Sequence, residues 1–460
     1  MSYKFVKNSK NAIPITIIQN AEFNNWLKKQ SAFIRHWTKN IGFAAKINDH
    51  CLIAAPDGTL LRVLAGVEDY NGIWSIAHLP PVLPSGTYFI DRELGRQAAT
   101  YLAIGWAMAC YRFKKYKTVK SRNKMPVLVW PNACDQAEVK RTVDAISLAR
   151  DLINTPAEDM GPAELAAAAR QVARLHKAKY HSITGDSLLK KNFPTIHAVG
   201  RAASKEPRIL DITWGRKGAP KLTLVGKGVC FDTGGLDLKS ASGMARMKKD
   251  MAGAACVLGL SHMIMDAGID VRLRVLIGAV ENSVSGNAYR PADVIKTRAG
   301  ITVEIGNTDA EGRLVMCDAL ALASEENPDL IVDYSTLTGA ARVALGSELA
   351  AYFCNDEKFA SDLQNAGEMV CDPVWRLPLW REYRYLLDSS VADINNVGSV
   401  GQGGAITAAL YLSEFIGDKI PWVHFDIMGW NTRSRSGRPI GGDVMGVRAL
   451  YSVLEKKFGK

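Results

Sequence analysis

Residues 307–314, with the sequence Asn-Thr-Asp-Ala-Glu-Gly-Arg-Leu, combine residue types that could perform chemistry. Two carboxylates, Asp309 and Glu311, lie two positions apart, and a glycine separates them from the fixed positive charge of Arg313. A strand-like apolar run precedes this segment and a helix-like run follows it. Because an open α/β sheet places its chemistry in the turns that follow its strands, we predict an acidic functional site here.

A purely local explanation of the same residues is a helix start without chemistry. Thr308 and Glu311 have the Thr-x-x-Glu spacing of a capping box ahead of an apolar run. Asp309 and Glu311 would also suit the positive end of a helix dipole. Arg313 does not fit this explanation, because a cation in the first turn opposes the dipole. We therefore expect Arg313 to hold an anionic group.

A second candidate segment begins directly after the strand-like residues 222–225. Residues 226–235, Gly-Lys-Gly-Val-Cys-Phe-Asp-Thr-Gly-Gly, place Lys227 and Asp232 in what we expect to be a turning loop, and Lys239 follows on the same loop. Glycines on both sides of the charged residues would allow the backbone to approach a bound group closely.

A helical pattern that starts near Met244 adds another carboxylate. Its spacing places Asp250 on an apolar face and directs Lys248 and Lys249 away from that face. The face is completed by Met247, Ala254, Val257 and Leu258. An ionised carboxylate in apolar surroundings is costly without a partner, so we expect either a lysine or a divalent cation beside Asp250.

Together, four carboxylates and two lysines fall at expected strand ends and helix starts: Asp232, Asp250, Asp309, Glu311, Lys227 and Lys239. Clustered carboxylates repel one another unless cations neutralise them, and two divalent ions about 3.5–4 Å apart would do so. The sequence contains no His-Glu-x-x-His motif and no Cys-x-x-Cys pair. The residues alone therefore predict an oxygen-rich metal site, with at most one amine ligand, in an α/β hydrolase.

The elements around these residues alternate between strands and helices. Apolar, β-branched runs at residues 222–225, 271–280, 330–332 and 423–427 are typical of strands buried on both faces, which form parallel sheets covered by helices. We predict an α/β fold in which a small N-terminal α/β domain precedes a larger catalytic domain with a mixed, mainly parallel central sheet covered by helices on both faces. The predicted boundaries are residues 1–140 for the basic N-terminal domain, 141–160 for a linking helix and junction, and 161–460 for the catalytic domain.

Residues 307–314 match the signature of the leucine aminopeptidase family of dinuclear-metal exopeptidases at all eight positions. Further blocks resemble the same family in the same order: residues 227–235, 247–251, 281–282, 285–291 and 336–340. The resemblance covers roughly residues 140–460, and several motifs in register make it specific. The N-terminal third matches no motif, although its size fits the family's variable N-terminal domain.

The resemblance implies two metal sites that share ligands. Lys227, Asp232, Asp250 and Glu311 would bind one metal, and Asp232, Asp309 and Glu311 would bind the other. The implied ions are Zn²⁺ or Mn²⁺, with Mg²⁺ or Co²⁺ as alternatives. Lys227 could be a ligand only as a neutral amine, which a nearby dication makes possible by displacing its proton.

The resemblance also implies an aminopeptidase that releases N-terminal amino acids from peptides with a free N-terminus. A water bridging the two metals would attack the first peptide carbonyl, and Lys239 would polarise that carbonyl and its developing oxyanion. Arg313 would hold a bicarbonate ion that takes a proton from the water. The first side-chain pocket and the substrate backbone would be lined by Met247, Asn307, Ala310, Thr336, Leu337, Thr338 and Gly339. Their mostly apolar character favours Leu- or Met-like residues.

Two departures from the family pattern lie next to this site. Thr233 stands where the family usually has serine, and Asp237 adds a negative charge two residues before Lys239. Asp237 could alter the metal preference or the pH optimum, but no implied ligand is missing. The family assembles as homohexamers, and the resemblance implies the same assembly here.

Composition and charge leave other function classes open. The chain is 47% apolar and 22% charged, with no apolar signal core at its N-terminus and no apolar run of membrane-spanning length, so we expect a cytoplasmic protein without a membrane partner. The net charge of +11 arises within residues 1–150, which contain 21 basic and 10 acidic residues. The excess is densest at Arg112, Lys114, Lys115, Lys117, Lys120, Arg122 and Lys124.

Such a basic run is usually a solvated surface, but it makes a DNA-binding regulator on the same scaffold the alternative function. A third alternative is a dinuclear hydrolase that acts on another amide or on a phosphate ester. The presence of Lys239 together with Arg313 argues against this third alternative.

Overall fold

The computed structural model describes residues 3–118 and 124–459, so Lys120 and Arg122 of the basic run lie outside the described residues. The chain divides into two compact units, Met1–Ser147 with Arg433–Ile440, and Leu148–Thr432 with Gly441–Lys460. The domain boundaries at residues 140 and 160 stay a prediction. Over the described ranges, no helix combines the length and the apolarity needed to cross a bilayer.

The first unit contains a six-stranded sheet in the order β1-β6-β5-β2-β4-β3, in which only β3 and β4 pair antiparallel. Its strands are β1 (Phe5–Val6), β2 (Ile13–Gln19), β3 (His50–Ala54), β4 (Leu60–Val67), β5 (Thr87–Ile90) and β6 (Val127–Val129). Its helices are α1 (Asn20–Lys28), α2 (Ala32–Asn40) and α3 (Arg96–Ala109). Trp106 of α3 is fully buried among the sheet residues, so this unit has a core of its own.

The second unit is organised around an eight-stranded sheet in the order β15-β14-β17-β13-β9-β10-β8-β7. Its strands are β7 (Lys179–Thr184), β8 (Arg208–Trp214), β9 (Lys221–Asp232), β10 (Arg272–Asn282), β13 (Leu330–Ser335), β14 (Ala350–Cys354), β15 (Val374–Arg376) and β17 (Trp422–Asp426). The pairs β15/β14, β17/β13, β13/β9 and β9/β10 are parallel, and the remaining pairs are antiparallel. The sheet is therefore mixed and mainly parallel, as predicted.

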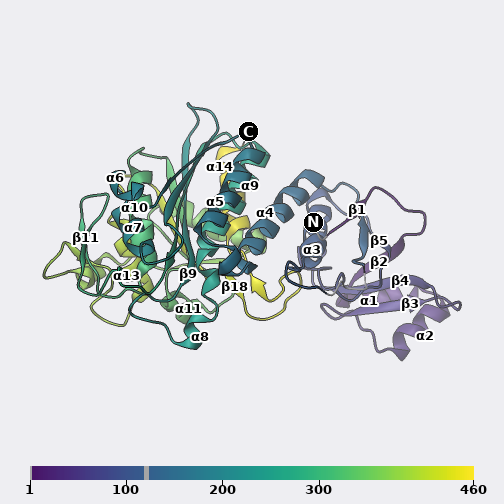
Figure 1. Ribbon diagram of the computed structural model, residues 1–460. Coiled ribbons are helices and arrows are strands. Elements are labelled where there is room, and N and C mark those ends of the chain that lie inside the picture. The colour runs from purple at the N-terminus through teal and green to yellow at the C-terminus, as the bar shows by residue number, and fades with distance from the viewer. Residues whose placement is uncertain (1–2, 119–123, 460) are drawn as a thin grey trace. The chain divides into compact units, whose positions relative to one another are not determined.

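Helices cover both faces of this sheet. In Figure 1, α7, α10 and α13 lie on one side of β9, whereas α5, α9 and α14 lie on the other. Helix α4 (Gln136–Asn154) begins in the first unit and ends in the second. The other larger helices of the second unit are α5 (Pro162–Leu175), α7 (Pro194–Gly200), α9 (Ala252–Ala267), α10 (Glu311–Ser324), α12 (Glu357–Met369), α13 (Gly404–Ser413) and α14 (Val447–Phe458). The shorter helices are α6 (Ser187–Lys190), α8 (Ala241–Met244) and α11 (Gly339–Leu345).

Short strands and 3₁₀ turns complete the second unit. The small strands are β11 (Val294–Lys296), β12 (Thr302–Glu304), β16 (Ile394–Asn395), β18 (Trp430–Asn431) and β19 (Gly441–Gly442). The 3₁₀ turns are η1 (Ala157–Asp159), η2 (Met247–Met251) and η3 (Arg381–Leu387). Strand β12 pairs with β11 and β16, and the chain passes from β12 into α10 through residues 305–310.

Two local predictions were wrong, and one alternative explanation is excluded. Strand β9 does not end at Val225 but continues to Asp232, because β10 pairs with it along almost its whole length. The helix expected from Met244 is instead a short helix, then the 3₁₀ turn η2, and then α9 from Ala252. No capping box forms at Glu311, since the residue before α10 is Ala310 and no side chain caps it.

Candidate metal centre

Strand β9 supplies the first two charged side chains of the site, Lys227 from its middle and Asp232 from its end, each only 2% exposed. Lys227 Nζ lies 2.7 Å from Asp250 Oδ2 and 2.7 Å from Glu311 Oε1. Gly312 permits this approach, because a Cβ at that position would lie 2.6 Å from Lys227 Cε. The lysine therefore joins strand β9 to the first turn of α10.

Asp232 is fixed by donors on both sides of its carboxylate. Its Oδ1 accepts hydrogen bonds from the backbone N–H of Gly234 at 2.9 Å and from Asn282 Nδ2 at 2.9 Å. Its Oδ2 lies 2.8 Å from Lys239 Nζ. Gly234 and Gly235 have φ values of 89° and 68°, which glycine adopts without strain, and this turn brings Lys239 back towards the strand end.

The 3₁₀ turn η2 positions Asp250. Thr336 Oγ1 donates a hydrogen bond of 2.6 Å to Asp250 Oδ1, while Oδ2 faces Lys227. The expectation that Lys249 points away from the apolar face was wrong, because Lys249 is only 2% exposed. The tighter 3₁₀ winding rotates this side chain inward relative to an α-helix. Burial lowers the pKa of Lys249 to about 8, although the Asp250 charge opposes the shift.

Asn396 holds the loop that carries Asp309 and Glu311. This fully buried side chain accepts hydrogen bonds from the N–H groups of Gly306 at 2.8 Å and Asn307 at 3.2 Å. Its amide nitrogen donates to the carbonyl of Asn307 at 2.8 Å. The loop backbone is therefore satisfied by one side chain from a distant segment.

Thr308 joins this loop to the loop that carries Lys239. Its hydroxyl donates to the carbonyl of Gly234 at 2.7 Å and accepts from the N–H of Asp237 at 2.8 Å. The N–H of Thr308 donates to Asp237 Oδ2 at 2.7 Å. The extra carboxylate of Asp237 thus makes a clasp with Thr308, and Tyr289 adds a hydrogen bond of 2.6 Å to the carbonyl of Thr308.

The carboxylates converge on a small volume. Carboxylate oxygens of Asp232, Asp309 and Glu311 all lie within 4.8 Å of one another. Asp250 is connected to this group through Lys227, which touches both Asp250 and Glu311. The four carboxylates share the ammonium groups of two lysines, so their contacts leave two negative charges unmatched.

Burial and mutual repulsion perturb these acids. Burial, together with the charge of Asp232, raises the pKa of Glu311 despite its contact with Lys227. Burial and the same neighbouring charge raise the pKa of Asp309 to about 6, although Lys239 opposes the shift. For Asp250, burial alone would raise the pKa, but the contact with Lys227 lowers it overall. Anions crowded in this way favour the binding of cations.

Lys239 and Arg313 occupy different surroundings. Lys239 Nζ contacts both Asp232 and Asp309, and its side chain is 14% exposed, so it lies at the mouth of the acidic cluster. Arg313 is buried on the first turn of α10 and donates a hydrogen bond of 2.5 Å to the carbonyl of Asn396. Burial lowers the pKa of Arg313, so an anion beside it would be favoured.

The predicted substrate residues lie on segments next to the acids. Asn307 and Ala310 flank Asp309 in the loop before α10, and Met247 lies on the same 3₁₀ turn as Asp250. The remaining four are consecutive: Thr336, Leu337 and Thr338 lie between β13 and α11, and Gly339 is the first residue of α11.

Asp426, at the end of β17, shapes that last segment. Its Oδ1 accepts hydrogen bonds from the N–H groups of Leu337 at 2.9 Å and Thr338 at 3.1 Å, and its Oδ2 accepts from Thr338 Oγ1 at 2.6 Å. Sequence reasoning missed both Asp426 and Asn396. The position of Asp426 at the end of a buried strand is a signal that could have found it, whereas Asn396 lies in a short polar segment with no such signal.

The donor set fits divalent cations. Among the described residues, Asp250 Oδ2 and Glu311 Oε1 are buried oxygens that accept no hydrogen bond, and their contact is with Lys227 Nζ. Carboxylate oxygens with one amine nitrogen suit Mg²⁺, Mn²⁺ or Zn²⁺ and disfavour metals that require thiolates. The arrangement can therefore hold metal ions that neutralise the acids.

Comparison with known proteins gives matches over nearly the whole chain. Residues 147–451 match the family described as "Cytosol aminopeptidase family, catalytic domain", and residues 13–131 match "M17 aminopeptidase, N-terminal domain". A protein named probable cytosol aminopeptidase from Roseiflexus castenholzii is 37% identical over 421 residues, which cover 87% of this chain and 84% of that protein.

Two solved structures have the same fold. The crystal structure of a cytosol aminopeptidase from Coxiella burnetii is 47% identical in sequence, covers 99% of each chain and superimposes with a TM-score of 0.95. The bottromycin maturation enzyme BotP in complex with Mn is 30% identical, covers 97% of this chain and 99% of that one, and has a TM-score of 0.87.

Proposed function

The chain belongs to the cytosol aminopeptidase family, and from this membership we propose that it removes N-terminal residues from peptides at a centre of two divalent metal ions. It is a peptide hydrolase of the aminopeptidase class. The two-metal centre, the ligand assignment and the residue preference are our proposals.

One observation carries the proposal of a metal centre. The oxygens of Asp232, Asp309 and Glu311 approach within 4.8 Å of one another, although only Asp309 has a side chain with substantial exposure, 34%. Bringing buried carboxylates together is unfavourable unless cations of matching charge join them. Two shared lysines supply half of the charge required for four carboxylates.

We assign the ligands as follows. Lys227, Asp232, Asp250 and Glu311 would hold one ion, and Asp232, Asp309 and Glu311 would hold the other. Zn²⁺ or Mn²⁺ is proposed, with Mg²⁺ or Co²⁺ as alternatives. When bound, the ions would supply Lewis acidity and a water that ionises near neutral pH.

Lys239 is proposed to act on the substrate. Its ammonium stands at the mouth of the cluster, where it could donate to the carbonyl oxygen of the first peptide bond as negative charge develops there. Its contacts with Asp232 and Asp309 raise its pKa even though burial opposes this, so the group stays charged. Arg313 is proposed to hold bicarbonate, which would supply a base.

Substrate selection is proposed to depend on residues around the acids. Met247, Asn307, Ala310, Thr336, Leu337, Thr338 and Gly339 would line the first side-chain pocket and contact the substrate backbone. The mostly apolar side chains among them favour substrates that begin with Leu or Met. The hydrogen bonds from Asp426 would keep the backbone at Leu337 and Thr338 in place for binding.

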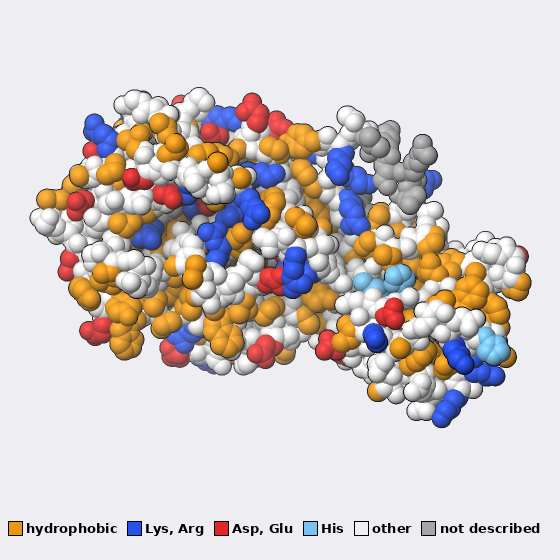
Figure 2. All heavy atoms as spheres, turned by 90° about the horizontal axis from the view of Figure 1, so that it is seen from below, with side chains coloured by type: hydrophobic (Ala, Val, Ile, Leu, Met, Phe, Trp, Pro, Cys, Tyr) orange, Lys and Arg blue, Asp and Glu red, His pale blue; other side chains and the backbone are white. Residues whose placement is uncertain are grey.

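The cellular setting is also a proposal. Relatives named cytosol aminopeptidases support a cytoplasmic location, and we propose the homohexameric assembly of the family. The comparisons give no support to the DNA-binding alternative. On the face drawn in Figure 2, Lys and Arg side chains are scattered among hydrophobic and acidic ones instead of forming one continuous basic surface.

Replacing Lys239 tests the proposed chemistry. We expect Lys239→Gln to lower the hydrolysis of amino-acyl amides by about two orders of magnitude or more at saturating Mn²⁺ or Zn²⁺, because a transition-state donor is lost. Asp309→Asn should lower both activity and metal content, measured by elemental analysis after dialysis. The matched controls, Lys190→Gln and Asp418→Asn, change exposed residues and should behave like the parent. Parental activity in Lys239→Gln, or parental metal content in Asp309→Asn, would contradict the assignment.

A further inference from the structure

A pocket of about 320 Å³ lies between α5 and the edge of the central sheet formed by β7 and β8. Helix α5 packs against both strands. The charged side chains that line the pocket are Arg170, Arg174 and Arg208, and no aspartate or glutamate is among the lining residues. None of them belongs to the acidic cluster.

The fold directs these side chains to one place. Arg170 and Arg174 lie four residues apart on α5 and therefore share a helix face. Tyr180 and Ser182 lie two residues apart on β7 and share a face of that strand. Arg208 begins β8 directly opposite Thr184, which puts it on the same face as Ser182.

The basic groups of this pocket are not neutralised by the protein. Within residues 3–118 and 124–459, no ion pair or hydrogen bond is found for the side chains of Arg170, Arg174 or Arg208. The guanidinium of Arg170 lies 5.1 Å from the ring centre of Tyr180. Arg208 Nε and Tyr180 Oη are buried and have no hydrogen-bond partner among the described residues. Such unpaired buried donors are costly, and a ligand that accepts from them would remove the cost.

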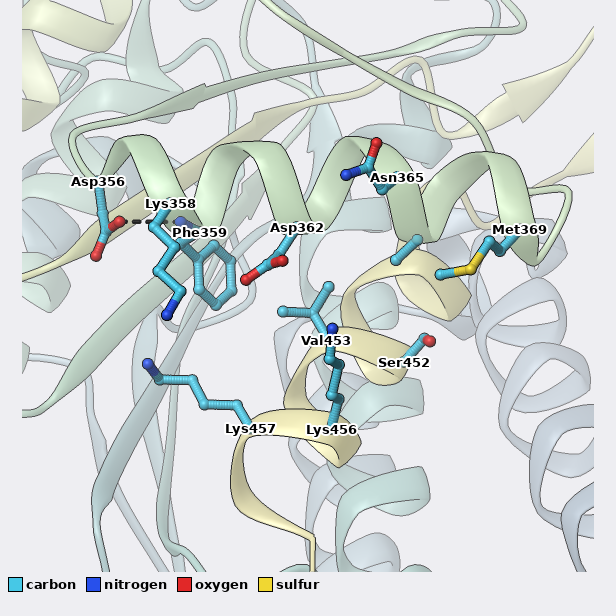
Figure 3. A pocket seen from close by; sticks show the side chains of 11 residues that line it. Asp356, Lys358, Phe359, Asp362, Asn365, Met369, Ser452, Val453, Lys456 and Lys457 are labelled. Atoms are coloured by element: carbon cyan, nitrogen blue, oxygen red, sulfur yellow. Dashed lines mark hydrogen bonds between the residues drawn. The ribbon is translucent and has the colours of Figure 1, made fainter.

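The pocket between α12 and α14 provides a useful contrast. It is larger, about 530 Å³, and its lining includes Lys358, Lys456 and Lys457. Figure 3 shows Lys358 of α12 and Lys457 of α14 extending towards each other. Asp356, which precedes α12, and Asp362 on α12 line the same pocket. Carboxylates thus accompany the lysines there, whereas the charged side chains that line the pocket beside α5 are all arginines.

We propose that the pocket formed by Arg170, Arg174, Arg208, Tyr180 and Ser182 binds a phosphate-bearing small molecule. Three guanidinium groups supply more positive charge than one carboxylate needs, and their planar donors match phosphate oxygens. The hydroxyls of Tyr180 and Ser182 can donate to the same oxygens. A volume of about 320 Å³ suits a ligand of the size of a phosphate monoester.

Calorimetric titration of the metal-loaded, full-length protein at low ionic strength tests this proposal. Inorganic phosphate and, separately, a nucleoside monophosphate are titrated into the parent, Arg174→Gln and Arg208→Gln. We expect each substitution to weaken phosphate binding by about tenfold or more, since a charge-assisted hydrogen bond is lost. Tighter binding of the nucleotide than of inorganic phosphate would identify an ester as the ligand, and equal binding would identify free phosphate.

The controls separate this site from the metal centre and from general charge effects. Lys217→Gln removes the same charge at an exposed position outside the pocket and should leave binding unchanged. Tyr180→Phe removes only a hydroxyl and should weaken binding about threefold to tenfold with the fold intact. Aminopeptidase activity should match the parent in every variant.

Three results would overturn the proposal. The first is phosphate affinity in Arg208→Gln equal to that of the parent, which would assign all binding to the metals. The second is equal weakening by Lys217→Gln, which would indicate unspecific attraction. The third is acetate binding as tightly as phosphate, which would make the ligand a carboxylate.

Discussion

Replacing Thr308 by valine tests whether the hydrogen bonds between the two site loops set the strength of metal binding. Valine has nearly the same shape as threonine but lacks the hydroxyl. That hydroxyl donates to the carbonyl of Gly234 at 2.7 Å and accepts from the N–H of Asp237 at 2.8 Å. The substitution therefore removes two hydrogen bonds between the loop of Lys239 and the loop of Asp309, whereas the backbone N–H of residue 308 still donates to Asp237 Oδ2.

The expected magnitude follows from these two bonds. Each neutral hydrogen bond contributes roughly 0.5–1.5 kcal/mol, so the loss is about 1–3 kcal/mol in total. If this free energy appears in the affinity for metal, binding weakens by about 5-fold to 150-fold. Loss of a residue that orients metal ligands commonly costs about 10-fold to 100-fold in metal affinity, which agrees with this range.

Equilibrium dialysis against Mn²⁺, with the bound metal quantified, measures the effect of Thr308→Val. Activity at saturating Mn²⁺ should return to within a few-fold of the parent, because every proposed ligand is still present. Thr297→Val is the matched control, since Thr297 is 2% exposed and its hydroxyl has no hydrogen-bond partner in the part of the chain that the structure describes. An unchanged Mn²⁺ affinity in Thr308→Val would refute the reasoning.

Three further substitutions test other parts of the structure. Gly312→Ala should lower kcat/KM at saturating metal about tenfold or more, because its Cβ would displace Lys227, and misplacing a group by ~1 Å can cost about 100-fold. Asp426→Ala should raise the KM for amino-acyl amides about tenfold, since two backbone N–H groups lose a charged acceptor. His424→Phe should remove a pH-dependent part of the stability: burial lowers the pKa of His424, but the charge of Asp333 raises it more. Because the pKa of His424 is raised in the folded state, its protonation adds to the free energy of unfolding. This added stability is fully present below about pH 6.5 and is lost as the pH rises through the folded-state pKa.

Each of these variants has a control and an outcome that counts against it. Gly286→Ala adds a Cβ where no atom lies within 4 Å and should keep the parental kcat/KM. A parental KM in Asp426→Ala would show that the loop after β13 does not depend on that carboxylate. For His424→Phe, the urea midpoint should fall more at pH 6 than at pH 8, and His181→Phe, at an exposed position, should show no such difference.

The sequence was sufficient to predict the α/β architecture because the central strands of the second unit, β9, β10, β13 and β17, are buried on both faces and appear in the sequence as apolar runs. It was also sufficient to predict that Asp232, Asp309 and Glu311 come together, and the fold brings their carboxylate oxygens within 4.8 Å of one another. It failed at Lys249 because a 3.6-residue period was applied to a segment that is wound as a 3₁₀ turn. Periodicity cannot distinguish these two windings over five residues.

Long-range hydrogen bonds were the other part that the sequence could not predict. The side chain of Asn396 accepts a hydrogen bond from the backbone N–H of Asn307, 89 residues earlier in the chain. The carboxylate of Asp426 accepts one from the backbone N–H of Leu337, also 89 residues earlier. A polar residue carries no periodic signal for such a contact, which depends on how distant loops meet after folding. The ends of strands indicate where such residues gather, but not which backbone groups they satisfy.

The acids that converge at this centre are distributed along the chain, and this affects when the centre can exist. A nascent chain that has left the ribosome only as far as residue 300 contains Lys227, Asp232 and Asp250 but neither Asp309 nor Glu311. Strand β17, which carries Asp426, is synthesised later still. Domains fold as units while synthesis proceeds at about 5–20 residues per second. Because β17 is part of the central sheet, we expect the proposed centre to form only after this strand has been synthesised. If the proposed ligand assignment holds, we expect unfinished chains that end before residue 309 to lack a complete metal centre and therefore to be inactive.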